Sequence, residues 1–195
     1  EQALEIGGLD DSGQALVERL IANHQAVADE MGDLTEAEGG VAWECTNPWL
    51  VDRLLTPVVE AIKTSDDPTR DVLNLAVALE NLAASTHQVL SVELSSADAK
   101  TATLEAATLA SRQSAEIVVL TRGADGYISP AVLGEGVPTD PSGVPYTYAI
   151  TSRFGSVGQA ELLVGAPDEN GGRESFTLQT PAANSFIYNE LEPSC

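Results

Sequence analysis

Apolar residues recur every three or four positions through most of the first 123 residues, and this spacing most constrains the fold. Such a repeat places apolar side chains on one face of an α-helix, and that face needs a partner to cover it. After residue 123 the pattern becomes an alternation of apolar and polar residues, and most of the Gly and Pro residues lie there. The sequence therefore predicts a mainly α fold, with a helical unit over 10–123 and a β-containing extension over 124–195.

Capping residues divide the helical unit into four segments. Asp10 and Ser96 are suitable N-caps, while Asn47 and Asp67 each precede a Pro at the first helical position. Gly32 is expected to stop the first helix. Short links between successive helices are typical of an antiparallel four-helix bundle. We expect helices at about 10–31, 47–63, 68–94 and 96–122.

The extension opens with a Gly/Pro-rich stretch over 124–144, expected to be irregular, and continues with β-type alternation. The run Pro167–Gly172, rich in Gly, Asn and Asp, reads as a hairpin loop. The sequence predicts a small antiparallel sheet that packs on the bundle, with strands at about 146–153, 157–165, 173–180 and 184–189.

Polar residues interrupt the apolar faces near the middle of three helices. His24 lies in the face of the first helix, Glu80 and His87 share one face of the third, and Gln113 lies in that of the fourth. Glu116 follows Gln113 by three positions. Because burying an unpaired charge is costly, such groups should be paired, protonated or bound to a metal.

Two interpretations of these polar residues remain open. Carboxylate and imidazole groups from facing helices can hold iron or manganese, so His24, Glu80, His87 and Glu116 are candidate metal ligands. The same residues can form a hydrogen-bonded polar network, with Gln113 as a polar residue of the bundle core. No Glu-x-x-His motif, the usual mark of a dimetal site, occurs in the chain.

Three stretches resemble the ferritin-like domain proteins found among exported bacterial proteins and plant desiccation-related proteins. Residues 79–88 are similar to the family's Glu-led third helix, and residues 110–115 resemble its Glu-x-Arg-His-Ala-Ala segment. The tail, from Arg153 to Tyr188, resembles the family's C-terminal extension. The resemblance implies a four-helix bundle and an exported protein. The family's metal-binding Glu and His of the fourth helix correspond to Ala110 and Gln113, which implies a degenerate metal centre.

Charge and cysteine content limit the partners and the compartment. The chain has 9 Lys and Arg against 30 Asp and Glu, a net charge of −21, which argues against nucleic acid and anionic lipid as partners. No apolar run is long enough to span a membrane. Glu1 in place of Met fits removal of a signal peptide and fits a shortened chain equally well. In an exported or cell-surface protein, Cys45 and Cys195 would most simply form a disulfide.

Three functional hypotheses follow. The first is a non-enzymatic, exported ferritin-like protein with a structural or interaction role, self-associating through strand edges after residue 145 and holding no cofactor. The second is a metal-binding or slow redox protein with one iron, manganese or zinc ion on His24, Glu80 and His87. The third is a small-molecule binder, with a pocket where Pro57 disturbs the second helix.

Overall fold

The computed structural model describes residues 2–42, 51–122 and 156–181, and these are mainly helical, as predicted. The strands are confined to the part after the helices. The elements are α1 (Gln2–Ile6), α2 (Asp11–Ala37), the π-helical turn η1 (Val51–Leu55), α4 (Thr56–Lys63), α5 (Pro68–Glu93), α6 (Ala97–Arg122), β1 (Ser156–Val164) and β2 (Glu174–Pro181).

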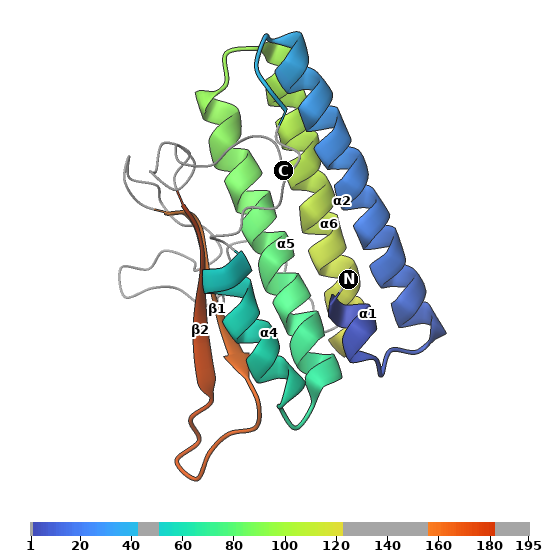
Figure 1. Cartoon of the computed structure of the whole chain (residues 1–195), viewed down its shortest axis with the longest axis vertical. Coiled ribbons are helices and arrows are strands. Elements are labelled where there is room, and N and C mark those ends of the chain that lie inside the picture. The colour runs from blue at the N-terminus through green and yellow to red at the C-terminus, as the bar shows by residue number, and fades with distance from the viewer. Residues whose placement is uncertain (1, 43–50, 123–155, 182–195) are drawn as a thin grey trace.

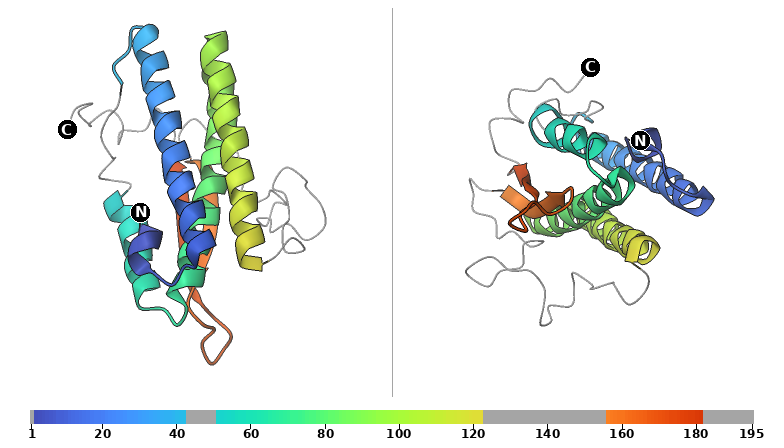
Figure 2. Two further views of the ribbon diagram at one scale, coloured as in Figure 1. Left: turned by 90° about the vertical axis from the view of Figure 1, so that its right-hand side faces the viewer. Right: turned by 90° about the horizontal axis from the view of Figure 1, so that it is seen from below.

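Three long helices, α2, α5 and α6, lie side by side, and the shorter α4 covers part of α5 (Figure 1). Helices α2 and α5 run in one direction, while α4 and α6 run in the other (Figure 1). The strands lie on the side of α5 away from α6, and β1 makes most of their contacts with it (Figure 2). The structure therefore places α5 at the centre of the molecule. A bundle of four full-length helices is not confirmed, because α4 is only 8 residues long.

The first helix begins as predicted and ends later. The Asp10 side chain accepts a hydrogen bond from the Gly13 N–H at 2.8 Å and caps α2. The expectation that Gly32 ends this helix is wrong, because α2 continues to Ala37. A Gly inside a helix costs only about 1 kcal/mol relative to Ala, so it does not by itself stop one. The helix ends instead before Gly39, which has a positive φ of 84° that few other residues adopt.

Pro57 marks the change from the π-helical turn η1 to the α-helix α4, and the helical backbone continues through Leu55 (φ −85°, ψ −46°). Pro57 lies in the first turn of α4, where the missing N–H of proline has no helical partner to lose. The preceding turn, Val51–Leu55, is π-helical. The expected start of this helix at Asn47 lies outside the described residues. The result is a short helix beside the first half of α5 (Figure 1).

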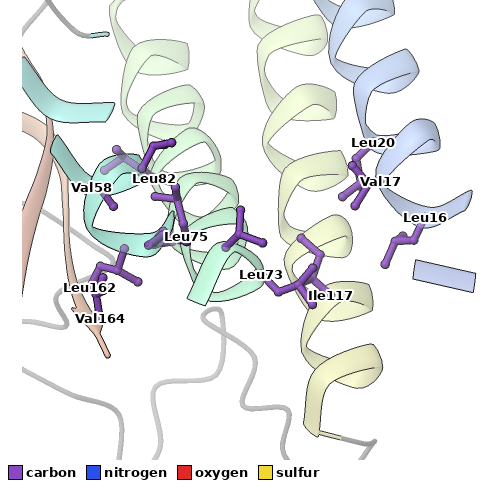
Figure 3. Packing of buried hydrophobic residues seen from close by; sticks show 14 residues of the cluster. Leu16, Val17, Leu20, Val58, Leu73, Leu75, Leu82, Ile117, Leu162 and Val164 are labelled. Atoms are coloured by element: carbon purple, nitrogen blue, oxygen red, sulfur yellow. The ribbon is translucent and has the colours of Figure 1, made fainter. Parts of the chain in front are cut away.

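Buried aliphatic side chains from every layer form one core around α5 (Figure 3). Leu73 of α5 meets Ile117 of α6 on one side, and Val58 and Leu162 pack on the other (Figure 3). The described helices contain no Phe, Tyr or Trp. Each buried Leu, Ile or Val contributes about 1.5–3 kcal/mol to stability relative to an exposed one. The stability of this core is therefore the sum of many moderate contributions.

The two described strands form an antiparallel hairpin in which Leu162 is paired with Phe176. Leu162 and Val164 are buried against α5. The buried carboxylate of Asp71 on α5 accepts a hydrogen bond from the Gly165 N–H at 2.9 Å and fixes the end of β1. These strands correspond to the two middle strands of the prediction. The other two, at 146–153 and 184–189, lie outside the described residues, so the extension as a whole stays a prediction.

Candidate functional site

A pocket of about 440 Å³ opens between α2, α4 and α5. Its walls are mostly aliphatic. Each helix contributes residues spaced three or four apart, so each presents one face to the pocket. The lining residues are Val17, Leu20, Ile21 and His24 of α2; Val51, Leu55, Thr56, Val59, Glu60 and Lys63 of η1 and α4; and Val72, Leu75, Ala76, Leu79 and Glu80 of α5.

The pocket exists because the helices that surround it carry no large side chain to fill it. Protein interiors are normally packed as densely as organic crystals, so unfilled space needs a cause. Here the lining of α5 includes the small Ala76, and none of the described residues in the lining is Phe, Tyr or Trp. The pocket also lies beside Pro57, where the regular helix is limited to Thr56–Lys63. Its position agrees with the sequence hypothesis of a pocket at this disturbance.

One end of the pocket carries an ion pair that joins α2 to α5. His24 Nε2 lies 2.7 Å from Glu80 Oε1. The Glu80 side chain is only 6% exposed, whereas that of His24 is 49% exposed. The hydrogen bond to Glu80 raises the pKa of His24, and burial opposes this shift. The structure therefore brings together two of the predicted site residues, which are 56 positions apart in the chain.

The second carboxylate oxygen of the same residue, Glu80 Oε2, is buried and has no hydrogen-bond partner among the described residues. A buried polar group left without a partner costs about 1–3 kcal/mol, and a charged one costs more. Native proteins rarely leave such atoms unpaired. The structure therefore leaves one buried acceptor unsatisfied in a residue that lines the pocket.

The opposite charges at the edge of the pocket are already paired. Lys63 Nζ donates to Glu60 Oε1 at 2.8 Å, and both side chains are largely exposed. Exposed pairs of this kind contribute only about 0–1 kcal/mol. This exposed pair therefore contributes little to the stability of the helices around the pocket.

The remaining candidate ligands are placed differently. His87 is half-buried on α5, and its pKa is lowered by burial and, to a lesser extent, by the charge of His24. Glu116 faces the surface, where it accepts from Arg19 of α2 at 2.8 Å. Among the described residues, no three His, Cys, Asp or Glu side chains come together in a way that could hold a metal ion. His24 and Glu80 thus meet without a third ligand there.

Gln113 of α6 is buried, and only 2% of its surface is exposed. Neither its amide nitrogen nor its amide oxygen has a partner among the described residues. Gln113 does not line the pocket. The predicted disulfide between Cys45 and Cys195 falls on residues outside the described part, so it stays a prediction.

Sequence reasoning missed most of the pocket wall. The lining residues of α4, Thr56, Val59, Glu60 and Lys63, show the i, i+3, i+4, i+7 spacing that would have marked a shared face. The shortness of this helix concealed the pattern. Across the pocket from this face lies α2, and no sequence pattern predicts that the space between the two helices stays open.

No family model matches the chain, and neither the curated proteins nor the solved structures give a match. The ferritin-like resemblance therefore stays a prediction. Among the described helices, none is sufficiently long and apolar to cross a membrane.

Proposed function

We propose that this chain binds a small, largely apolar molecule in the pocket between α2, α4 and α5. The observation that carries the proposal is an aliphatic pocket ending on a buried carboxylate. Its volume of about 440 Å³ lies within the range of about 300–1,000 Å³ that is usual for small-molecule sites. Such sites combine apolar walls with a few polar groups that orient the ligand, and His24 and Glu80 supply these groups here.

Burial of apolar surface supplies the driving force. Open aliphatic walls leave apolar surface in contact with water, and removing it from water is favourable by about 25 cal/mol per Å². A ligand that fills the space regains the packing that the helices lack. The pocket is bounded by buried side chains such as Val17, Leu20 and Val59, so its walls are held in place by the core.

Filling the pocket tests the proposal. Ala76→Phe places a ring in the space from α5, and Ala22→Phe adds the same ring at an exposed position of α2 outside the pocket. The neutral dye Nile red, which fluoresces in apolar surroundings, serves as the probe. We expect saturable binding to the wild type and to Ala22→Phe, and binding at least tenfold weaker to Ala76→Phe.

Two results would contradict this proposal. One is the lack of saturable binding of Nile red by the wild-type chain. The other is equal binding by the wild type and Ala76→Phe. Ala76→Leu, which fills less of the pocket, guards against a folding defect of the larger variant and should weaken binding to an intermediate degree.

A second candidate function is binding of one metal ion, with His24 and Glu80 as ligands. The observation that favours it is their 2.7 Å contact together with the free second oxygen of Glu80. Elemental analysis of the native protein and of Glu80→Ala tests it. Stoichiometric iron, manganese or zinc that is lost in the variant would support it, and no metal in either would remove it. Self-association and a structural role in assembly stay predictions.

A further inference from the structure

We infer that the molecule bound in this pocket is an apolar amine, whose ammonium group donates to Glu80 Oε2. The inference rests on the proposed function, because it specifies the ligand of the same pocket. It starts from the one buried polar atom in the pocket lining that has no partner among the described residues.

The geometry of the carboxylate shows which kind of group it can accept. Oε1 contacts His24 Nε2 at 2.7 Å, while Oε2 is buried and has no partner among the described residues. An ionised carboxylate only accepts hydrogen bonds, so the complementary group must be a donor. A donor that reaches Oε2 would complete the bonding of Glu80 without disturbing the link between α2 and α5.

Charge distinguishes the classes of donor. A cationic donor forms a charge-assisted hydrogen bond with a carboxylate, which is about twice as strong as a bond between neutral groups. An ammonium group also balances a charge that lies in a buried position, whereas a hydroxyl group cannot. An acid would place a second negative charge beside Glu80 in a chain whose net charge is already −21.

The edge of the pocket offers an anion no comparable site. Lys63, the one cationic Lys or Arg side chain in the lining, is already paired with Glu60. Both side chains are largely exposed, so water screens them. The asymmetry between a buried, half-satisfied carboxylate and an exposed, paired ammonium favours a basic ligand over an acidic one.

The walls determine the rest of the ligand. The residues of α5 that line the pocket run from Val72 to Glu80, which is eight steps or about 12 Å along the helix axis. Aliphatic side chains occupy the length between them. The occupant is therefore expected to be an extended or compact apolar body of comparable length, with its amine at the Glu80 end.

A matched ligand series tests this inference on the full chain. Octylamine, octan-1-ol and octanoate share one chain length and differ in the terminal group. Their affinities are measured at pH 8 by calorimetry and by displacement of Nile red. We expect octylamine to bind about tenfold more tightly than octan-1-ol, since one charge-assisted bond replaces a neutral one, and octanoate to bind most weakly.

Two variants test whether Glu80 is the source of the preference for octylamine. Glu80→Gln keeps the shape of the side chain and removes its charge, so it should bring octylamine to the affinity of octan-1-ol. Glu105→Gln removes an exposed carboxylate of α6 outside the pocket and should leave the preference for octylamine in place. Thermal unfolding of both variants verifies that they are folded.

The outcomes separate the two levels of the proposal. Equal binding of the three probes would overturn the amine inference and leave the pocket as a general apolar site. Preferred binding of octanoate that is lost in Lys63→Gln would also overturn it. If neither Nile red nor any probe bound, the proposed function itself would fail.

Discussion

The faces of α5 differ in how completely they are filled. Against α6 on one face and β1 on another, which together we call the filled region, α5 is closely packed. Toward α2 and α4, which we call the open region, a pocket lined by all three helices interrupts the packing. Both regions are lined by aliphatic residues at helical spacing. Side-chain type alone therefore does not decide whether helices close on one another.

Length of contact explains the difference. Helix α6 buries Ala102, Ala106, Ala107 and Ala110 along its length, and small side chains allow helices to approach closely. Helix α2 buries residues only in its first half, up to Leu20. Opposite it lies α4, whose α-helical part is limited to 8 residues because the turn before it is π-helical. A short helix beside two long ones leaves a pocket where a full-length helix would have filled the core.

Truncating one side chain in each region should give the largest difference in stability between the two regions. Ile117→Ala creates a cavity in the filled region, where the residue is 0% exposed, and should lower the free energy of unfolding by about 2–5 kcal/mol. Leu79→Ala enlarges a pocket that already exists and should cost less than half as much. Urea unfolding of both variants measures the difference. Equal losses would mean that the open region is packed like the rest of the core.

The hydrogen bonds that attach the hairpin should be nearly as important. Burial raises the pKa of Asp71, but hydrogen bonds from Arg70 and Gly165 outweigh it, and the net pKa lies below its usual range. Asp71→Ala leaves these donors without their acceptor and should destabilise the fold by about 1–3 kcal/mol. Urea unfolding measures this loss. An unchanged midpoint would show that the hairpin contributes nothing to the filled region.

The same fully buried carboxylate predicts a pH dependence. A lowered pKa means that the folded state releases the proton more readily, so Asp71 stabilises the fold above its unfolded pKa, near 3.8. This contribution is lost as the pH falls through the folded pKa. The wild type and Asp71→Ala should therefore converge in stability in acid.

Adding one side chain to each region should give opposite signs. Ala107→Leu overpacks the filled region and should destabilise the protein by about 1–3 kcal/mol. Ala76→Leu extends into the pocket and should leave stability unchanged or increase it. The midpoints of thermal unfolding compare the two variants. Destabilisation of similar size by both would argue that there is no space beside Ala76.

The ion pair at the end of the open region should give the smallest effect. Because the pKa of His24 is raised by its hydrogen bond to Glu80, the pair stabilises the fold below pH 6.5, and this contribution is lost as the pH rises through the folded pKa. The effect should stay below about 1 kcal/mol because the imidazole is half exposed. Unfolding of the wild type and His24→Asn at pH 6 and pH 9 measures it. A larger difference at pH 9 than at pH 6 would contradict this sign.

Local sequence signals predicted the helices well and their spacing poorly. Caps at Asp10 and Asp67 start α2 and α5 as expected, because a cap depends only on neighbouring residues. The prediction from Gly32 was wrong, because a glycine inside a helix lowers its stability only modestly and the rest of a long amphipathic helix outweighs that loss.

The candidate site, too, was predicted only in part. Helical spacing placed His24 and Glu80 on apolar faces, and the structure joins them across α2 and α5. A polar side chain on a buried face needs a polar partner, and this requirement explains why His24 and Glu80 lie next to each other. Glu116 is near such a face in sequence, yet it pairs with Arg19 at the surface. That orientation depends on a partner 97 positions away, which no local pattern reveals.

The most direct test of the central claim is to locate a bound molecule by NMR of the methyl groups during a titration with octylamine. We expect saturable shifts at Val59, Leu75 and Leu79, which line the pocket, and little change at Ile117 and Leu162 of the filled region. Shifts confined to exposed methyl groups such as Leu104 and Val119, or no saturable shift at all, would contradict the account.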